Sequence, residues 1–120
     1  MTKANEVLNL WQDDVNDMIM YRGVKSGNPD KIGGPSFFSS EEEFAKTNGK
    51  TSAFKLNVKN PKIIDKRTWS DSVGSWDNMR PDAQKMLVKS LRDEGFDSVV
   101  CDYETMWLAF VIDPNRTKLV

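Results

Sequence analysis

Three short stretches of the chain carry side chains whose types and spacing could do chemistry. The first is Tyr21-Arg22-Gly23, where an arginine stands within an otherwise apolar strand candidate at 19–24. A guanidinium in that setting needs an anion or a carboxylate to meet it, and Gly23 would let a ligand or a neighbouring backbone come close. The alternative interpretation is an edge-strand arginine that reaches solvent.

The second stretch, Phe37-Phe38-Ser39-Ser40, runs into three glutamates. Ser40 with Glu43 three residues later is typical of a capping box, which predicts a strand followed at once by a capped helix. Capping leaves Ser39 unexplained, and only one of two successive strand phenylalanines should face the core. The stretch is therefore either a core strand with a helix cap or part of a ligand cradle.

The third stretch is Asp102-Tyr103-Glu104, a turn between two apolar strand candidates at 96–102 and 106–112. Two carboxylates at the end of a sheet can have different catalytic roles. One can stabilise a developing cation while the other accepts a proton from a nucleophile. The alternative is a solvated polar turn, although Glu is less typical of turns than Asp.

The elements that must position these residues follow from periodicity and from Gly and Pro signals. The order of helices and strands predicts a single α+β domain with a small, mostly antiparallel sheet and flanking helices. The helix from Pro81 to Gly95 should bury Ala83, Met86, Leu87, Val88 and Leu91. The expected helices are 4–17, 41–48 and 81–94. The expected strands are 19–24, 37–40, 51–58, 63–64, 96–102, 106–112 and 117–120. Residues 25–35 are expected to form a loop, and residues 66–80 either a loop or a broken short helix.

Composition restricts the function further. The chain of 120 residues has 17 basic and 18 acidic side chains, a net charge of −1, which argues against nucleic acid as a direct ligand. It has no histidine and one cysteine, so His-ligated metals, Ser–His or Cys–His pairs and internal disulfides are excluded. No signal peptide is evident, and the apolar run 106–112 is too short to cross a bilayer. We expect a cytoplasmic, metal-free monomer with no membrane partner, in which Cys101 is a buried apolar residue and Trp69 and Trp76 either pack or contact a partner.

The order of these stretches resembles the Arg–Ser–Glu class of mono-ADP-ribosyltransferases. More narrowly, the chain is similar to the small ADP-ribosyltransferase-like domains of phages and mobile elements, from about residue 20 to the C-terminus. The resemblance implies one ADP-ribosyltransferase-like domain over 1–120 with a split sheet, an N-terminal helix over 1–18 and a catalytic-type core over 19–120. The segments that carry it, besides YRG, are FFSSE (37–41), LNVKNP (56–61), GFDSVV (95–100) and FVIDP (110–114).

The resemblance implies NAD as the co-substrate. Glu104 would stabilise the oxocarbenium-like state as nicotinamide leaves, and Asp102, where the family has Glu or Gln, would position the acceptor. Ser39 would lie on the floor strand of the site and either orient the catalytic glutamate or contact the nicotinamide ribose.

On the cofactor side, the resemblance implies that Arg22 grips a phosphate or the adjoining ribose. Phe38 or Tyr21 would pack on the nicotinamide ring, and Gly23 and Ser40 complete the expected NAD-binding set. The loop 25–35 would fold over the dinucleotide.

The expected function is transfer of ADP-ribose to a host or defence protein by a phage or mobile-element effector in the host cytoplasm. Two alternatives stay open. One is a non-catalytic protein of the same fold that inhibits a partner by surface contact, and the other is hydrolysis of NAD without a protein acceptor.

Overall fold

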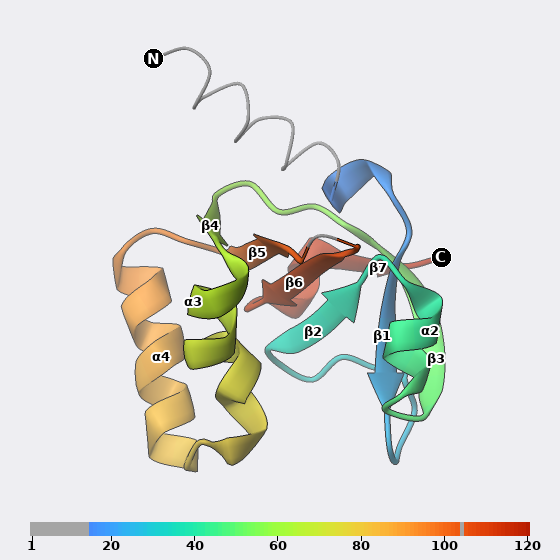
Figure 1. Ribbon diagram of the computed structural model, residues 1–120, viewed down its shortest axis with the longest axis horizontal. Coiled ribbons are helices and arrows are strands. Elements are labelled where there is room, and N and C mark those ends of the chain that lie inside the picture. Colours follow the sequence, from blue (N-terminus) through green and yellow to red (C-terminus); the bar gives the residue numbers. More distant parts are fainter. Residues whose placement is uncertain (1–14, 104) are drawn as a thin grey trace.

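The computed structural model describes residues 15–103 and 105–120, so the expected helix at 4–17 lies largely outside the described residues (Figure 1). Residues 15–17 are helical. The strands are β1 (Met20–Val24), β2 (Ser36–Ser39), β3 (Lys50–Leu56), β4 (Pro61–Ile64), β5 (Ser98–Asp102), β6 (Trp107–Val111) and β7 (Thr117–Leu119). The helices are α2 (Glu42–Lys46), α3 (Lys66–Asp71) and α4 (Pro81–Asp93), with 3₁₀ turns η1 (Val73–Asn78) and η2 (Pro114–Arg116).

The strands form one curled sheet in the order β4-β5-β6-β2-β1-β3-β7. Only the β4–β5 pair is parallel, which confirms the α+β class and the mostly antiparallel sheet. The joint between β2 and β1 consists of the single pair Tyr21↔Ser39, whereas β1 pairs with β3 along its whole length. The sheet is therefore continuous, but its two halves meet at one point.

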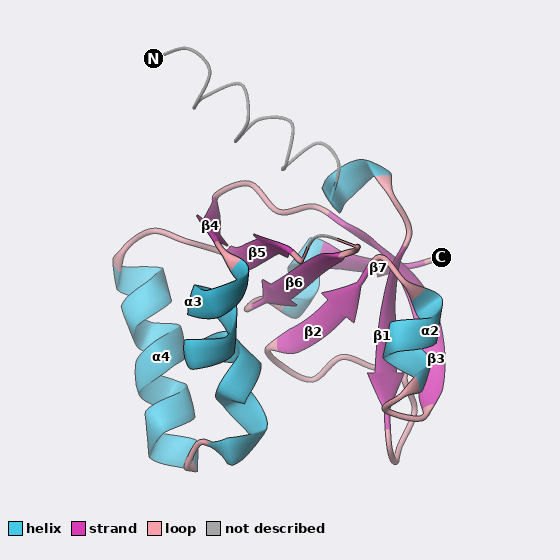
Figure 2. Ribbon diagram, in the orientation of Figure 1, coloured by secondary structure: helices cyan, strands magenta, loops and turns pink. Residues whose placement is uncertain are grey.

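Each face of the sheet carries its own core. Because strand side chains alternate, β6 sends Ala109 and Val111 to one face and Leu108 and Phe110 to the other. We call these the first face and the second face. The second face is covered by α3, η1 and α4 at one end and by α2 at the other, as Figure 2 shows. Every residue of β6 after Trp107 is buried, as expected of the run 106–112.

Helix α4 begins and ends as the sequence predicts. Pro81 occupies its first turn, and Gly95 follows its end with a φ of +89°. The N–H of Phe96 donates to the carbonyl of Leu91 and that of Gly95 to Arg92, both at 2.9 Å, which is a Schellman motif. The predicted apolar face is wrong for Ala83 and Met86. Both are exposed, because α4 meets the core along a narrow stripe that includes Leu87, Val88 and Leu91.

The predicted capping box at Ser40 is wrong. Helix α2 has Glu41 at its N-cap with no side-chain cap, and the carboxylate of Glu43 instead contacts Lys46 at 3.3 Å. The backbone N–H of Ser40 donates to the carbonyl of Trp107 at 2.9 Å, and the N–H of Trp107 donates to the Ser40 hydroxyl at 2.8 Å. Ser40 therefore extends the contact between β2 and β6, which leaves its hydroxyl unable to serve the helix.

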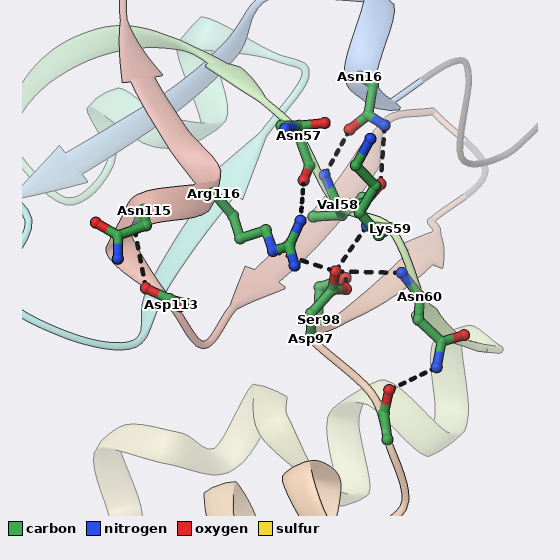
Figure 3. Close-up of polar contacts among 11 residues, drawn as sticks. Asn16, Asn57, Val58, Lys59, Asn60, Asp97, Ser98, Asp113, Asn115 and Arg116 are labelled. Atoms are coloured by element: carbon green, nitrogen blue, oxygen red, sulfur yellow. Dashed lines mark hydrogen bonds and ion pairs between the residues drawn. The ribbon is translucent and has the colours of Figure 1, made fainter.

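Asp97, just before β5, is the centre of a polar network (Figure 3). Its Oδ2 accepts the backbone N–H of Lys59 at 2.6 Å and that of Asn60 at 3.2 Å, and its Oδ1 accepts the Ser98 hydroxyl at 2.8 Å. The guanidinium of Arg116 lies 3.5 Å from the same carboxylate. Asp97 thus fastens the turn between β3 and β4 to the start of β5.

Two further side chains, those of Asn16 and Arg116, form hydrogen bonds with the backbone of the same turn. The side-chain amide of Asn16 donates to the carbonyl of Val58 and accepts its N–H, both at 3.0 Å. Arg116 donates through Nη1 to the carbonyl of Asn57 at 3.3 Å (Figure 3). The N–H of Ile112 donates to the carbonyl of Asp97 at 3.2 Å, so the segments LNVKNP, GFDSVV and FVIDP are adjacent in space and these contacts give them a structural role.

Candidate functional site

A cleft of about 670 Å³ lies on the second face of the sheet, between α2 and the α3–η1 segment. Its volume is within the range of pockets that hold small ligands and cofactors. The floor comes from β1, β2 and β6, one wall from α2 and the other from α3 and η1. The cleft therefore spans the point where the two halves of the sheet meet.

Tyr21 and Ser39 form this floor side by side, since they are the one residue pair that joins β1 to β2. Ser39 is 3% exposed, and its hydroxyl accepts the N–H of Glu41 at 3.0 Å while contacting the sulfur of Met106 at 3.5 Å. Met106 belongs to the turn that joins β5 to β6. Ser39 thus connects the cleft floor to the turn that follows Asp102.

The wall opposite α2 is aromatic. The ring of Phe37 lies 5.9 Å from that of Trp69 and 6.4 Å from that of Trp76, both edge-on, and 4.9 Å from that of Phe110. A Cβ on Gly74 would lie 2.8 Å from the Trp69 carbonyl and 2.9 Å from its indole ring, so a glycine is required there. Both tryptophans pack in the core of the second face, which is one of the two alternatives that the sequence left open, and both also line the cleft.

Phe38, expected to pack on a ligand ring, is a core residue of the first face. It is 2% exposed, and its ring centroid lies 5.4 Å from that of Phe54. The phenylalanine whose ring is on the cleft side is Phe37, because β2 pairs Phe37 with Phe110 and Ser39 with Leu108. The register of the sheet decides which of the two rings a ligand could meet.

Arg22 is met by backbone carbonyls. Alternation along β1 places its Cβ on the face of Met20, opposite Tyr21. Its Nη1 donates to the carbonyls of Pro29 at 2.9 Å and Lys31 at 3.1 Å, and burial lowers the pKa of its guanidinium. Arg22 also borders the cleft, so it connects the loop 25–35 to the cleft edge.

Only part of the loop 25–35 lies at the cleft, where the resemblance placed the whole loop. The Ser52 hydroxyl, beside Arg22 on β3, bonds to the carboxylate of Asp30, and Ile32 packs against the core of the first face. The middle of the loop is therefore fastened to the first face. Only its ends, at Lys25, Ser26 and Pro35, line the cleft, so the expected fold of the whole loop over a dinucleotide is not what the structure contains.

Gly23 serves the packing of α2. A Cβ at this position would collide with the carbonyl oxygen of Ala45 and lie 2.9 Å from the carbonyl carbon. Of the two reasons that the sequence offered for this glycine, the approach of a neighbouring backbone is the one found. Because α2 forms a wall of the cleft, Gly23 shapes the site indirectly.

Of the predicted acidic stretch 102–104, the structure describes Asp102 and Tyr103. Asp102 is exposed at the end of β5, opposite Trp107, and does not belong to the described residues that line the cleft. The N–H of Tyr103 donates to the carbonyl of Met106 at 2.8 Å, and the Lys66 ammonium lies 5.1 Å from the centre of the Tyr103 ring. The predicted catalytic Glu104 lies outside the described residues.

Several cleft residues were not singled out by the sequence, and three of them carry side chains that could contact a ligand. Phe44 and Asn48 come from the wall formed by α2, and Asp77 from η1 is the one carboxylate among the described residues that line the cleft. Asn48 precedes a helix-ending glycine and Asp77 lies in a polar stretch, so both look like ordinary surface residues in the sequence. The one sequence signal for Asp77 is its position next to Trp76, a residue that could contact a partner.

Cys101 is buried, as expected, and its thiol is held neutral. The pKa of Cys101 is raised to about 11, first by burial and then by the negative charges of Asp102 and Asp65. We expect a disulfide reagent such as dithiobis(nitrobenzoate) to label it at pH 8 at least about a hundredfold more slowly than in the urea-unfolded chain, because little thiolate is present. Labelling of the native protein within seconds would contradict this placement.

Comparison with known proteins gives no match to any family model, to any curated protein or to any solved structure. In the described part of the chain, no three His, Cys, Asp or Glu side chains gather as metal ligands would, and no helix is long and apolar enough to cross a membrane.

Proposed function

We propose that this protein is a mono-ADP-ribosyltransferase that binds NAD in the cleft between α2 and η1 and transfers ADP-ribose to a protein side chain. One observation carries the proposal: Tyr21 and Ser39 pair on the cleft floor, and the Ser39 hydroxyl touches Met106 of the turn that follows Asp102. Two of the three sequence stretches thereby meet the third at one end of a ligand-sized cleft. The acceptor is proposed to be a host or defence protein in the host cytoplasm.

The cleft offers NAD both apolar and polar contacts. The aromatic wall of Phe37, Trp69 and Trp76 suits the flat rings of a dinucleotide, which stack or lie edge-on against such side chains. Tyr21 lines the cleft, and among the described residues its hydroxyl has no hydrogen-bond partner, so it can bond to a ribose. Lys25, at the cleft edge, suits a phosphate by its charge.

The reaction needs a group that stabilises the positive charge developing on the ribose as nicotinamide leaves. The bond between C1 of the nicotinamide ribose and the ring nitrogen breaks, and nicotinamide leaves with the bonding electrons. Glu104 is proposed to stabilise the cationic sugar, while a nucleophile of the target protein attacks C1 and gives its proton to Asp102 or to solvent. The negative charge of Glu104 would stabilise the transition state more than it stabilises bound NAD.

The experiment is transfer of labelled NAD to proteins of a bacterial lysate, with NAD affinity measured separately by calorimetry. Glu104→Gln should reduce transfer by about a hundredfold or more, in the range expected for loss of a group that stabilises charge in the transition state, while NAD still binds. Tyr21→Phe should weaken NAD binding, since it removes only the hydroxyl. Ser52→Ala on β3 is the matched control and should change neither quantity, because Ser52 bonds to Asp30 in the loop that is fastened to the first face.

Transfer that persists undiminished in Glu104→Gln would overturn the assignment of the catalytic acid. Failure of the intact protein to bind NAD would overturn the function itself. Release of nicotinamide without a mass increase of about one ADP-ribose on any protein would show NAD hydrolysis in place of transfer.

A second candidate is a non-catalytic protein that inhibits a partner by surface contact. The observation that favours it is the use of Arg22 Nη1 by two loop carbonyls, together with the position of Asp102 outside the cleft lining. If this alternative holds, the intact protein does not bind NAD, and the Glu104→Gln variant inhibits the partner as strongly as the intact protein does. The calorimetry described above therefore separates the two candidates.

A further inference from the structure

A second concavity, of about 480 Å³, runs along one face of α4. Helix α4 contributes to it from Pro81 to Asp93, a distance of about 18 Å along the helix axis. Its floor includes Pro35, Trp76 and Val88, all apolar. We call it the α4 groove. An apolar floor of this length is suited to a peptide segment that brings apolar side chains of its own.

The α4 groove and the cleft share a wall. Pro35 and Trp76 are the two residues that line both concavities. The indole of Trp76 is half-buried and packs against Phe110 at 5.1 Å, so the wall is anchored in the core of the second face. A segment seated in the α4 groove would therefore lie immediately beside whatever occupies the cleft.

The rim of the α4 groove is positively charged. Lys85, Lys89 and Arg92 line it against a single acid, Asp93, which pairs with Lys89 at 2.6 Å. Among the described residues, neither Lys85 nor Arg92 forms an ion pair. The whole chain has a net charge of −1, so this gathering of cations runs against the average charge of the protein.

We propose that the α4 groove docks an acidic segment of the protein substrate, with its apolar side chains on Trp76 and Val88 and its carboxylates on Lys85 and Arg92. This proposal rests on the transferase function, because it names the partner of the same site. Charge complementarity of this kind speeds encounter and selects the partner, and the shared wall delivers the acceptor to the cleft. A bare phosphate would leave the apolar floor unused.

The test measures binding without NAD, so it does not depend on catalysis. The probes are three fluorescein-labelled twelve-residue peptides, one of Glu and Leu, one of Glu and Ser and one of Lys and Leu, and a labelled twelve-nucleotide single-stranded DNA. Fluorescence anisotropy is recorded at low and at high salt. We expect the Glu–Leu peptide to bind the intact chain most tightly and to lose affinity as salt rises, since exposed charges are screened.

Lys85→Glu and Arg92→Gln should each weaken binding of the Glu–Leu peptide on the order of tenfold, without lowering the melting temperature. The matched control is Lys118→Glu on β7, an exposed lysine at the far edge of the sheet, which should leave the affinity unchanged. Equal weakening by Lys118→Glu, preference for the Lys–Leu peptide or absence of peptide binding would overturn the proposal. Tighter binding of the DNA would overturn it in favour of a nucleic-acid surface, and none of these outcomes bears on NAD binding.

Discussion

Replacing Asp97 with alanine is expected to lower the free energy of unfolding by about 3 kcal/mol. The side chain of Asp97 is 15% exposed, and its carboxylate accepts hydrogen bonds from Lys59, Asn60 and Ser98 while facing Arg116. The substitution leaves two backbone N–H groups without their acceptor and the guanidinium without its counter-charge. Urea unfolding followed by circular dichroism measures the effect.

The control for this variant is Asp113→Ala. Asp113 Oδ1 accepts one backbone N–H, that of Asn115, at 3.0 Å, so its loss should cost about 1 kcal/mol. Asp97→Asn should fall between the two, because it keeps an acceptor and loses the charge. If Asp97→Ala destabilises the protein no more than Asp113→Ala does, the network around Asp97 is not what holds the β3–β4 turn.

Gly23→Ala is expected to destabilise the protein by about 3 kcal/mol, at the upper end for overpacking. The added methyl would collide with the carbonyl oxygen of Ala45 in the backbone of α2, and a backbone group cannot rotate aside as a flexible side chain can. Helix α2 must therefore move away from β1. Because Phe44, Ala45 and Asn48 line the cleft, ligand binding should weaken along with stability.

Gly33→Ala provides the comparison for Gly23→Ala. A Cβ at Gly33 meets no atom within 4 Å, so alanine there should be neutral or slightly stabilising. Thermal unfolding of the two variants should differ widely although both add one methyl group to a glycine. Equal melting temperatures would mean that α2 does not pack on β1 as closely as described.

Much of the local structure could be predicted from the sequence, because local signals act within a few residues. The alternation that buries Phe54 and Leu56 in β3 is a property of any half-buried strand, and it is found, although β3 ends before Val58, which is also buried. Pro81 and Gly95 limit α4 through their own backbone preferences. The burial of Cys101 follows from its position in an apolar strand.

Contacts between distant segments could not be read from these signals. The capping box at Ser40 satisfied every local rule, yet its hydroxyl is taken by Trp107, which is 67 residues away. The contact of Arg22 Nη1 with two loop carbonyls was not predicted, and the pairing of β2 with β6 decided that Phe37, not Phe38, lies on the cleft side. A shift of one residue in that register would have reversed the choice.

The sequence by itself thus determined the α+β class, the order of the elements and the chemically capable stretches, since each depends on residue type and short-range spacing. The tertiary structure alone decided which of those side chains share a face. The single Tyr21↔Ser39 joint, the cleft above it and the wall of Pro35 and Trp76 that separates it from the α4 groove arise where the two halves of the sheet and its covering helices come together. Such positions depend on the packing of segments far apart in the chain, which no local pattern specifies.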